Sequence, residues 1–333
     1  MANGTRTRTR TRIGMVGAGG VGQRHVATLS GLDDVTVVAV ADTDPQRAAA
    51  LATACGATAY DSAAELLDRE RVDALYVCVP PFAHGAPEQA ALERRVPFFV
   101  EKPLGVDLAV AERIATAVSD ADLLTGTGYH WRCLDTVQRA QELLADRPAR
   151  LVQGQWLDKV PPVPWWVHAD RSGGQVVEQL THVLDLARAV VGEAVEVYAA
   201  GVRTAAGSSS DADVDDVTVA TMRFASGALG TIAATCLLGW KHVAALQVVA
   251  PGMTLSLSET ELVVDDGRTR TLHRPAADPR VQVDREFVDA VQGRRAAVRV
   301  PYAEALRTHR LGCALATSAR AGQPVTVEDG ADG

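Results

Sequence analysis

The sequence predicts an α/β protein in which a doubly wound parallel sheet is followed by a second unit with a mainly antiparallel sheet. Between residues 13 and 127, short apolar runs alternate with alanine-rich segments of helical periodicity. That alternation is typical of parallel strands covered by helices on both faces. After about Gly128, one strong helical segment is followed by consecutive strand-like runs with Gly, Ser and Asp turns between them, which indicates antiparallel strands.

The elements follow in this order along the chain. The expected strands of the first unit are Ile13–Gly17, Val35–Ala41, Ala57–Tyr60, Ala74–Val79, Pro97–Val100 and Leu123–Gly126, with Pro45–Ala54 and Pro87–Arg94 among its helices. The second unit is expected to contain a long helix, Gln175–Val191, and the strands Val195–Val202, Val217–Phe224, Gly230–Leu238, Val243–Val249, Met253–Leu257 and Glu261–Val264. Two more helices are expected between Asp284 and Ala321.

The amino-acid composition indicates which segments lie outside the two folded units. Residues 1–12 are basic and polar and are expected to be a disordered tail. The polar segment 205–216 is expected to be a solvated loop, because its aspartates lack the Gly and Glu of a calcium-binding loop. The chain therefore divides into a tail (1–12), a first domain (13–128) and a second domain (129–333).

Composition excludes several classes of protein. The 333 residues are 47% hydrophobic, which is enough for two packed units. A net charge of −8 argues against nucleic acid as the main partner, and no apolar run is long enough to span a membrane. The N-terminus lacks the apolar core of a secretory signal. The five cysteines show no metal-binding spacing, so we expect reduced, mostly buried thiols in a cytoplasmic protein.

A glycine motif follows the first expected strand. Gly17, Gly19 and Gly22 form G-x-G-x-x-G where that strand leads into a helix. Gly17 makes the tight turn, Gly19 lets the backbone approach a pyrophosphate, and Gly22 lets helix and strand pack closely. We therefore expect a dinucleotide along Gly17–Gly22, which includes Gly20 and Val21, with its phosphates at the helix N-terminus. The alternative is a glycine-rich turn that binds no ligand.

The second expected strand ends at Asp42, twenty residues after Gly22. A carboxylate at this position accepts hydrogen bonds from the adenosine ribose and repels a 2′-phosphate. The next residue is Thr43 rather than an arginine, so NAD is favoured over NADP. Arg47, one helical turn further on, keeps NADP as the less favoured option.

Lys102 stands out because the chain has only three lysines, Lys102, Lys159 and Lys241. It follows Glu101 at the end of the fifth expected strand, at the sheet edge where ligands bind in open α/β folds. A solvent-facing lysine is the alternative. The fourth strand leaves the sheet at the same edge, through Val79 and Pro80. His84 follows, and it either lines the cofactor site or serves the start of the next helix.

The expected helix Gln175–Val191 carries a polar face. Glu178, His182 and Asp185 lie together on the side opposite its apolar residues. A carboxylate one turn from an imidazole orients the ring and raises its basicity, so Glu178 and His182 form a candidate proton-handling pair. A surface salt-bridged face is one alternative. A metal site is the other, but no third ligand has suitable spacing and no metal is expected.

Taken together, these motifs resemble the Gfo/Idh/MocA family, the glucose–fructose oxidoreductase, inositol dehydrogenase and rhizopine-catabolism group. The residues that carry the resemblance are GAGGVG with Arg24-His25, Asp42, VCVPPFAH, Glu101-Lys102-Pro103, TGYHWR and GGQVVEQLTHVLDLAR, within Ile13 to about Val327. The resemblance implies an N-terminal Rossmann domain. It also implies a C-terminal domain whose open, mainly antiparallel sheet builds homodimers or homotetramers.

The resemblance also implies roles for single residues. Lys102 is expected to contact both cofactor and substrate, and His182 to act as the acid/base. Glu178 stands where relatives commonly carry aspartate. His130 and Trp131 are expected near the substrate, where Trp131 offers a flat surface to a sugar ring or packs in the interior. The residues assigned to the cofactor side, besides the glycine turn, are Asp42, Val79, Pro80, His84, Glu101, Lys102, Trp165 and Trp166.

The expected function is reversible NAD-dependent oxidation of a secondary alcohol on a sugar, sugar derivative or cyclitol, with Lys102, Glu178 and His182 as polar catalytic groups. Two alternatives stay open. One is an epimerase-like or glycosidase-like enzyme that keeps NAD tightly bound and uses it transiently. The other is a dinucleotide-sensing regulator without catalysis, which would not need Lys102 and His182.

Overall fold

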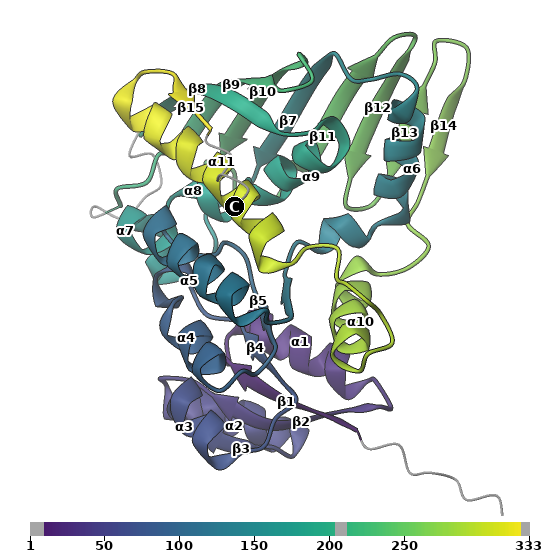
Figure 1. Ribbon diagram of the computed structural model, residues 1–333. Helices are drawn as coiled ribbons and strands as arrows, with labels where there is room; N and C mark the ends of the chain where they lie inside the picture. Colours follow the sequence, from purple (N-terminus) through teal and green to yellow (C-terminus); the bar gives the residue numbers. More distant parts are fainter. Residues whose placement is uncertain (1–9, 204–211, 328–333) are drawn as a thin grey trace, which may run out of the picture.

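The computed structural model describes residues 10–203 and 212–327. Most of the expected tail, and residues 205–211 of the expected loop, lie outside these ranges. The described end of that loop is packed rather than solvated, because Val214 is buried among Trp166 and Cys236. Figure 1 shows one sheet at each end of the molecule, with helices on and between the sheets.

The first sheet is parallel and six-stranded, in the order β3-β2-β1-β4-β5-β6. Its strands are β1 (Thr11–Val16), β2 (Val35–Ala41), β3 (Thr58–Tyr60), β4 (Ala74–Val77), β5 (Phe98–Val100) and β6 (Thr125–Thr127). The helices between them are α1 (Gly20–Ser30), α2 (Pro45–Cys55), α3 (Ala63–Arg69), η1 (Pro81–Ala83), α4 (Ala86–Glu93) and α5 (Leu108–Ala121). This topology confirms the predicted doubly wound sheet. Because β1 begins at Thr11, the expected tail is two residues too long.

The second sheet has nine strands in the order β14-β13-β12-β11-β7-β10-β9-β8-β15. Its strands are β7 (Leu151–Leu157), β8 (Ala194–Val202), β9 (Val217–Phe224), β10 (Leu229–Thr235), β11 (Val243–Ala250), β12 (Met253–Ser258), β13 (Leu262–Asp265), β14 (Arg270–His273) and β15 (Val325–Thr326). Every pair among these strands is antiparallel except β7 with β10. The predicted mainly antiparallel sheet is therefore confirmed.

The remaining helices are α6 (Asp135–Ala145), α7 (Ala169–Ser172), α8 (Gln175–Glu178), α9 (Thr181–Val191), α10 (Pro279–Val291) and α11 (Tyr302–Ala321), with short turns η2 (His130–Cys133) and η3 (Pro164–Val167). The single helix expected over Gln175–Val191 is wrong, because α8 and α9 are separate. At the break, the Leu180 amide donates to the Gln175 carbonyl oxygen, five residues back, instead of four. Lys102 Nζ donates to the Glu178 carbonyl oxygen at 2.9 Å, and this is the oxygen that a continuous helix would offer to the amide of His182.

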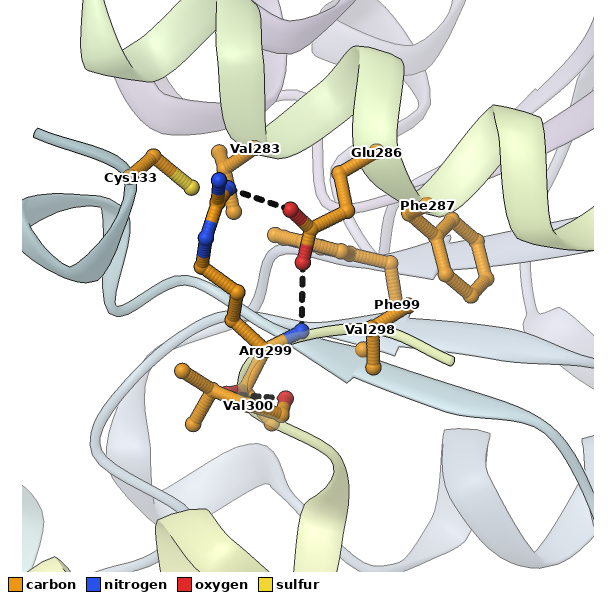
Figure 2. Close-up of a pocket in the computed structure, with 10 residues that line it drawn as sticks. Phe99, Cys133, Val283, Glu286, Phe287, Val298, Arg299 and Val300 are labelled. Atoms are coloured by element: carbon orange, nitrogen blue, oxygen red, sulfur yellow. Dashed lines mark hydrogen bonds and ion pairs between the residues drawn. The ribbon is translucent and has the colours of Figure 1, made fainter. Parts of the chain in front are cut away.

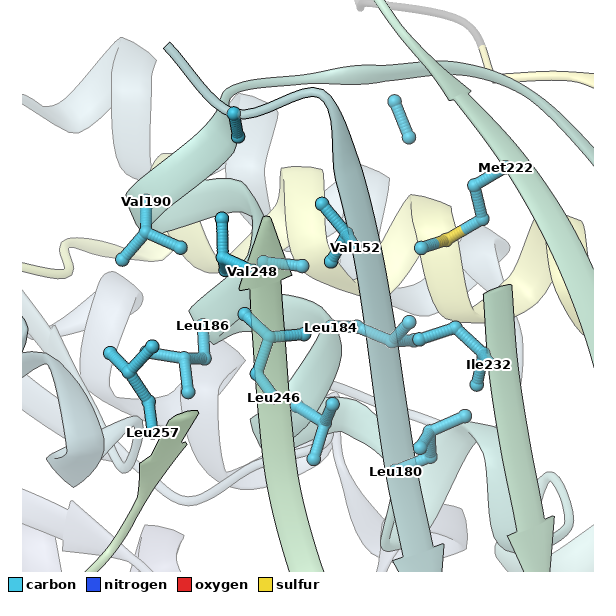
Figure 3. Close-up of a cluster of buried hydrophobic side chains, with 14 of the residues drawn as sticks. Val152, Leu180, Leu184, Leu186, Val190, Met222, Ile232, Leu246, Val248 and Leu257 are labelled. Atoms are coloured by element: carbon cyan, nitrogen blue, oxygen red, sulfur yellow. The ribbon is translucent and has the colours of Figure 1, made fainter. Parts of the chain in front are cut away.

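One face of the second sheet is packed and the other is open. α9 and α11 lie along the packed face (Figure 1). Leu180 and Leu184 from the α8–α9 region meet Val152, Ile232 and Leu246 there (Figure 3). The opposite face carries the alternate residues of β7–β10, among them the exposed apolar side chains Leu151, Tyr198, Val202, Val219 and Leu229.

The C-terminal helices return to the first sheet. α10 packs beside α1, and its Val283 and Phe287 belong to the same buried cluster as Ile13 and Tyr76. Tyr302, at the start of α11, joins the cluster on the other side of that sheet. The division of the chain at residues 128 and 129 stays a prediction, and α10 and α11 link its two parts.

Three further expectations concern the whole chain. All five cysteines are free thiols, and Cys78, Cys133 and Cys236 are buried, as predicted. None of the helices in the described part of the chain has the length and apolar character needed to cross a membrane. Within residues 10–203 and 212–327, no group of three or more His, Cys, Asp or Glu side chains is arranged to hold a metal ion.

Candidate active site

The glycine turn between β1 and α1 has the geometry that the motif predicts. Gly17 adopts φ +96°, and a Cβ there would lie 2.2 Å from the carbonyl oxygen of Cys78. A Cβ at Gly22 would lie 1.9 Å from the Gly17 carbonyl oxygen, so neither position accepts a side chain. A Cβ at Gly19 or Gly20 would meet nothing within 4 Å, so the backbone is open on that side. Bare amides at the start of α1, whose N-cap residue makes no side-chain bond, suit a pyrophosphate.

Asp42 is fixed beside this turn at the end of β2. Its Oδ2 accepts a hydrogen bond from the Ala18 amide at 2.7 Å. Its Oδ1 accepts from the Asp44 amide at 2.9 Å and from Arg47 Nη2 at 3.1 Å. The carboxylate expected to bind the adenosine ribose therefore lies against the glycine turn. Arg47 is held by two carboxylates, because its Nε also lies 3.3 Å from Asp44.

Val79 and Pro80 follow β4 at the same sheet edge, whereas His84 turns into the protein. The His84 ring is buried, and its Nδ1 lies 2.6 Å from Glu88 Oε1. The other Glu88 oxygen accepts the Gly85 amide at the start of α4. These contacts fit the alternative in which His84 serves the start of the helix. Its contact with a cofactor stays a prediction.

Lys102 reaches from β5 to the second half of the chain. Its Nζ donates to the Glu178 carbonyl oxygen at 2.9 Å and to Glu178 Oε1 at 3.0 Å. The other carboxylate oxygen, Oε2, accepts a hydrogen bond from Trp166 Nε1 at 2.8 Å. Trp166 is fully buried, while Trp165 lies edge-on to Phe82 with ring centroids 6.4 Å apart. The structure thus joins Lys102, Glu178 and Trp166 in one network.

Glu178 does not pair with His182, which corrects the expectation drawn from their spacing. The carboxylate oxygens of Glu178 instead accept hydrogen bonds from Lys102 and Trp166. His182 Nδ1 is buried and makes no hydrogen bond within the described residues. Asp185, expected on the same face, instead binds Arg132 at 2.8 and 2.9 Å.

His182 is surrounded by aromatic rings. Trp131 and Trp156 lie nearly parallel to its imidazole, with centroids 5.6 and 6.0 Å away, and His130 lies edge-on at 5.0 Å. Trp131 is only 2% exposed, so it packs against His182 in the interior. Burial, followed by the positive charges of Lys102 and His130, lowers the pKa of His182 well below its ordinary value. The ring is therefore neutral near pH 7, and a neutral imidazole can accept a proton.

Sequence reasoning missed a second group of residues at this site. Glu259, in the turn after β12, lies 3.2 Å from His130 Nε2 and also pairs with Arg280. Lys241, in the loop before β11, places its Nζ 4.7 Å from the centre of the Trp156 ring. The sequence did contain a signal for Lys241: the chain has only three lysines, and Lys241 is one of them, as Lys102 is. Glu259 carries no sequence signal, since only the strand pairing brings its turn to His130.

The small cavity drawn in Figure 2 is a packing defect rather than a binding site. It lies between α10 and the ends of β5 and β6, beside the ion pair of Glu286 and Arg299, with Cys133 at its edge. Its volume of about 10 Å³ has room for one water molecule at most.

Both parts of the chain match described protein families. Residues 11–129 match a family described as "Oxidoreductase family, NAD-binding Rossmann fold", and residues 138–254 match the "GFO/IDH/MocA C-terminal domain". The chain is 30% identical over 230 residues to the myo-inositol 2-dehydrogenase of Thermotoga maritima, which covers 66% of this chain and 67% of that protein. It is 29% identical over 185 residues to an inositol 2-dehydrogenase of Rhizobium meliloti, 55% of each chain.

A solved structure supports the fold over nearly the whole chain. Levoglucosan dehydrogenase in complex with NADH and L-sorbose superposes with a TM-score of 0.86 at 20% identity, covering 96% of this chain and 100% of the other. At this identity the likeness confirms the predicted two-sheet architecture.

Proposed function

The chain belongs to the Gfo/Idh/MocA family of NAD-binding oxidoreductases, and from this premise we propose that it interconverts a secondary alcohol and a ketone on a sugar, sugar derivative or cyclitol. One observation carries the proposal. The Lys102 ammonium and the buried, neutral His182 imidazole belong to one site, joined through the turn that Glu178 begins. The two relatives described above are inositol 2-dehydrogenases, which supports the substrate class.

NAD is the cofactor of this family, and the residues present fit it. The open backbone at Gly19 and Gly20 would take the pyrophosphate, and Asp42 would take the adenosine ribose. Bound NAD supplies the nicotinamide that accepts a hydride from the carbinol carbon, and that returns it in the reverse direction.

The protein groups handle the proton and the charge of the substrate oxygen. His182 accepts the hydroxyl proton, because its lowered pKa keeps the imidazole neutral at physiological pH. The Lys102 ammonium stabilises the negative charge that develops on that oxygen. Glu178 holds the ammonium through two of its oxygens and is itself held by Trp166. Glu178 therefore acts by positioning Lys102 rather than by orienting His182.

The substrate class can be tested directly. The purified protein is incubated with NAD and each of myo-inositol, other inositols, levoglucosan and common hexoses, and NADH is followed by absorbance. We expect NADH to form with at least one polyol. If NAD binds but no member of the panel yields NADH, and no matching ketone consumes NADH, the proposed dehydrogenase function is wrong.

Asp42 is expected to set the choice between NAD and NADP. Replacing Asp42 by Ser removes the carboxylate that repels a 2′-phosphate and frees Arg47 to pair with that phosphate. We expect the preference for NAD over NADP to fall by about tenfold or more, which corresponds to about 1.4 kcal/mol. The measurement is the dissociation constant of each dinucleotide by calorimetry.

Asp44→Ser is the matched control for this prediction. It also takes one carboxylate from Arg47, while serine keeps the cap of α2. We expect it to leave the preference nearly unchanged. An equal effect of both substitutions would assign discrimination to Arg47 alone and remove Asp42 from the ribose site.

The open face of the second sheet supports a homo-oligomer. Its central exposed positions, alternating along β7–β10, are uncharged, and the side chains of Tyr198 and Val219 border a shallow depression of about 410 Å³. The charged residues Glu196 and Arg223 lie toward the strand ends of this face and face each other. A face with an uncharged centre suits a second copy of the same chain, because a two-fold axis lets the face cover itself.

Val219→Asp is expected to weaken this association. The carboxylate would be buried without a partner in the interface, so dimers or tetramers should give way to monomers in light scattering after size exclusion. Val281→Asp, an exposed apolar position on α10 away from this face, is the control and should leave the mass unchanged. A wild-type protein that is monomeric at about 50 μM, well above the Kd of a stable dimer, would contradict the assembly.

A further inference from the structure

His25 is a buried histidine that joins three separate elements. It lies on α1, its ring is 2% exposed, and it packs against Tyr76 and Phe99 with centroids 5.5 and 5.3 Å away. Its Nδ1 lies 2.7 Å from Asp284 Oδ1 on α10, and its Nε2 lies 2.9 Å from Glu101 Oε1 at the end of β5. The dinucleotide helix, the lysine-bearing turn and a C-terminal helix therefore meet at one ring.

The contacts fit a ring that carries a proton on both nitrogens, with both carboxyl groups ionised. A neutral imidazole has one N–H donor, yet both nitrogens of His25 face carboxylate oxygens. Burial lowers the pKa of His25, but the charges and hydrogen bonds of Asp284 and Glu101 outweigh it and raise the pKa to about 9. Arg24 Nη2 also lies 3.2 Å from Glu101 Oε1, so two cations offset the two carboxylates.

Glu101 connects this buried cation to Lys102. While its Oε1 binds His25, its Oε2 accepts the backbone amide of Lys102 at 3.1 Å. The carboxylate has little room to move, because a Cβ at Gly128 would lie 2.4 Å from Oε2. Beyond this link, the Lys102 side chain donates to Glu178. One chain of hydrogen bonds therefore runs from Asp284 through His25, Glu101 and Lys102 to Glu178.

We propose that His25 is a positioning residue for the reaction: its doubly hydrogen-bonded imidazolium fixes Glu101, and Glu101 fixes the Lys102 backbone so that the ammonium stands at Glu178 beside His182. Loss of the ring proton would turn one nitrogen lone pair toward a carboxylate and release this arrangement. The inference rests on the role proposed above for Lys102.

Charged and titratable groups from every neighbouring element face this ring, and they set where it loses its proton. Arg24 lies on the same helix as His25, Tyr76 on β4 and Cys78 directly after that strand. Glu101 and Lys102 follow β5, and Asp284 and Arg285 lie on α10. Burial raises the pKa values of Tyr76 and Cys78 well above their ordinary values, so both stay neutral. Asp284 is the carboxylate that can be altered without touching Glu101 or Lys102.

The decisive variant is Asp284→Asn. The amide keeps the size of the side chain and an oxygen that accepts from His25, but it removes the charge that holds the ring protonated. We expect the alkaline fall of kcat to move to lower pH by about 1–2 units, so that kcat at pH 7 keeps about half or more of the wild-type value. The KM for NAD should change less than about threefold, because the substitution loosens only the backbone at Lys102 and leaves the glycine turn in place.

Asp289→Asn is the matched control, because this carboxylate lies on the same helix and pairs with Arg285 and Arg294 instead of His25. It should leave the alkaline fall in place. A substitution that acts only on folding would lower the melting temperature without moving the pH profile, so an unshifted profile in Asp284→Asn overturns the inference.

A spectroscopic experiment tests the protonation of His25 without requiring enzyme turnover. Histidine side-chain nitrogen spectra of the full-length protein, with His25 identified by its loss in His25→Gln, report the protonation of each ring nitrogen. We expect His25 to carry both protons at pH 7.5 and to titrate near pH 9, and at lower pH in Asp284→Asn. A neutral His25 at pH 7.5 overturns the inference. Failure of the whole substrate panel would instead overturn the dehydrogenase function and leave this experiment intact.

Discussion

Lys102→Met is expected to lower kcat by about a hundredfold to a thousandfold, the usual loss when one donor to a developing oxyanion is removed. Methionine keeps the length of the side chain but cannot donate to the substrate oxygen or to Glu178, which Lys102 Nζ contacts at 2.9 and 3.0 Å. NAD affinity should stay largely intact, because the glycine turn and Asp42 are untouched. The measurements are steady-state kinetics with the best polyol of the panel and calorimetric binding of NAD.

Lys159→Met is the matched control, since it removes another of the three lysines from an exposed position. We expect it to keep near-wild-type kcat. A Lys102→Met variant that also retained near-wild-type kcat would show that Lys102 does not stabilise the substrate oxygen. A variant that instead lost NAD binding would make Lys102 a cofactor residue first.

His182→Ala is expected to lower kcat by about a hundredfold to ten-thousandfold, the range for loss of a general base. The pH profile gives the sign of the effect. Burial first, and then nearby positive charges, lower the pKa of His182 well below 6.5, and only the neutral ring accepts a proton. Alcohol oxidation by the wild type should therefore keep its acid limb below pH 6.5, and this limb should be absent from the residual activity of His182→Ala.

The two active-site predictions constrain each other. The positive charge of Lys102 follows burial as a cause of the lowered pKa of His182, so Lys102→Met should move the acid limb to higher pH. His273→Ala, on the edge strand β14, is the control for histidine removal. An acid limb that stayed at the same pH in His182→Ala would assign it to another group and leave His182 without the proposed role.

Most of the fold could be predicted because its local signals agree with its packing. Val35–Ala41 and Val217–Phe224 were expected with the bounds that the structure has, since each is a strand with β-branched residues between turn signals. β7 was missed although it lies in the middle of the second sheet. Its buried face includes Gly154, where a Cβ would lie 2.4 Å from Ile232 Cδ1, and a glycine between two glutamines hides the strand pattern.

The candidate site could be predicted in its members but not in its contacts. Lys102 and Glu178 were expected to share a site, and the structure joins them directly. The spacing of Glu178 and His182 indicated a pair one helical turn apart, but periodicity assumes a continuous helix. The helix is interrupted after Glu178, and the Glu178 side chain bonds to a lysine 76 positions away in the sequence.

The amino-acid sequence by itself determined the parallel sheet with its glycine turn, and it singled out Asp42, Lys102 and His182 as members of the candidate site. These depend on residue type, period and short spacing, which are local properties of the chain. Only the tertiary structure decided which side chain holds which: Glu178 on Lys102, Glu259 on His130, and His25 between Asp284 and Glu101. Such pairs join residues far apart in sequence, so they arise from packing, where buried charges must find partners wherever the fold brings them.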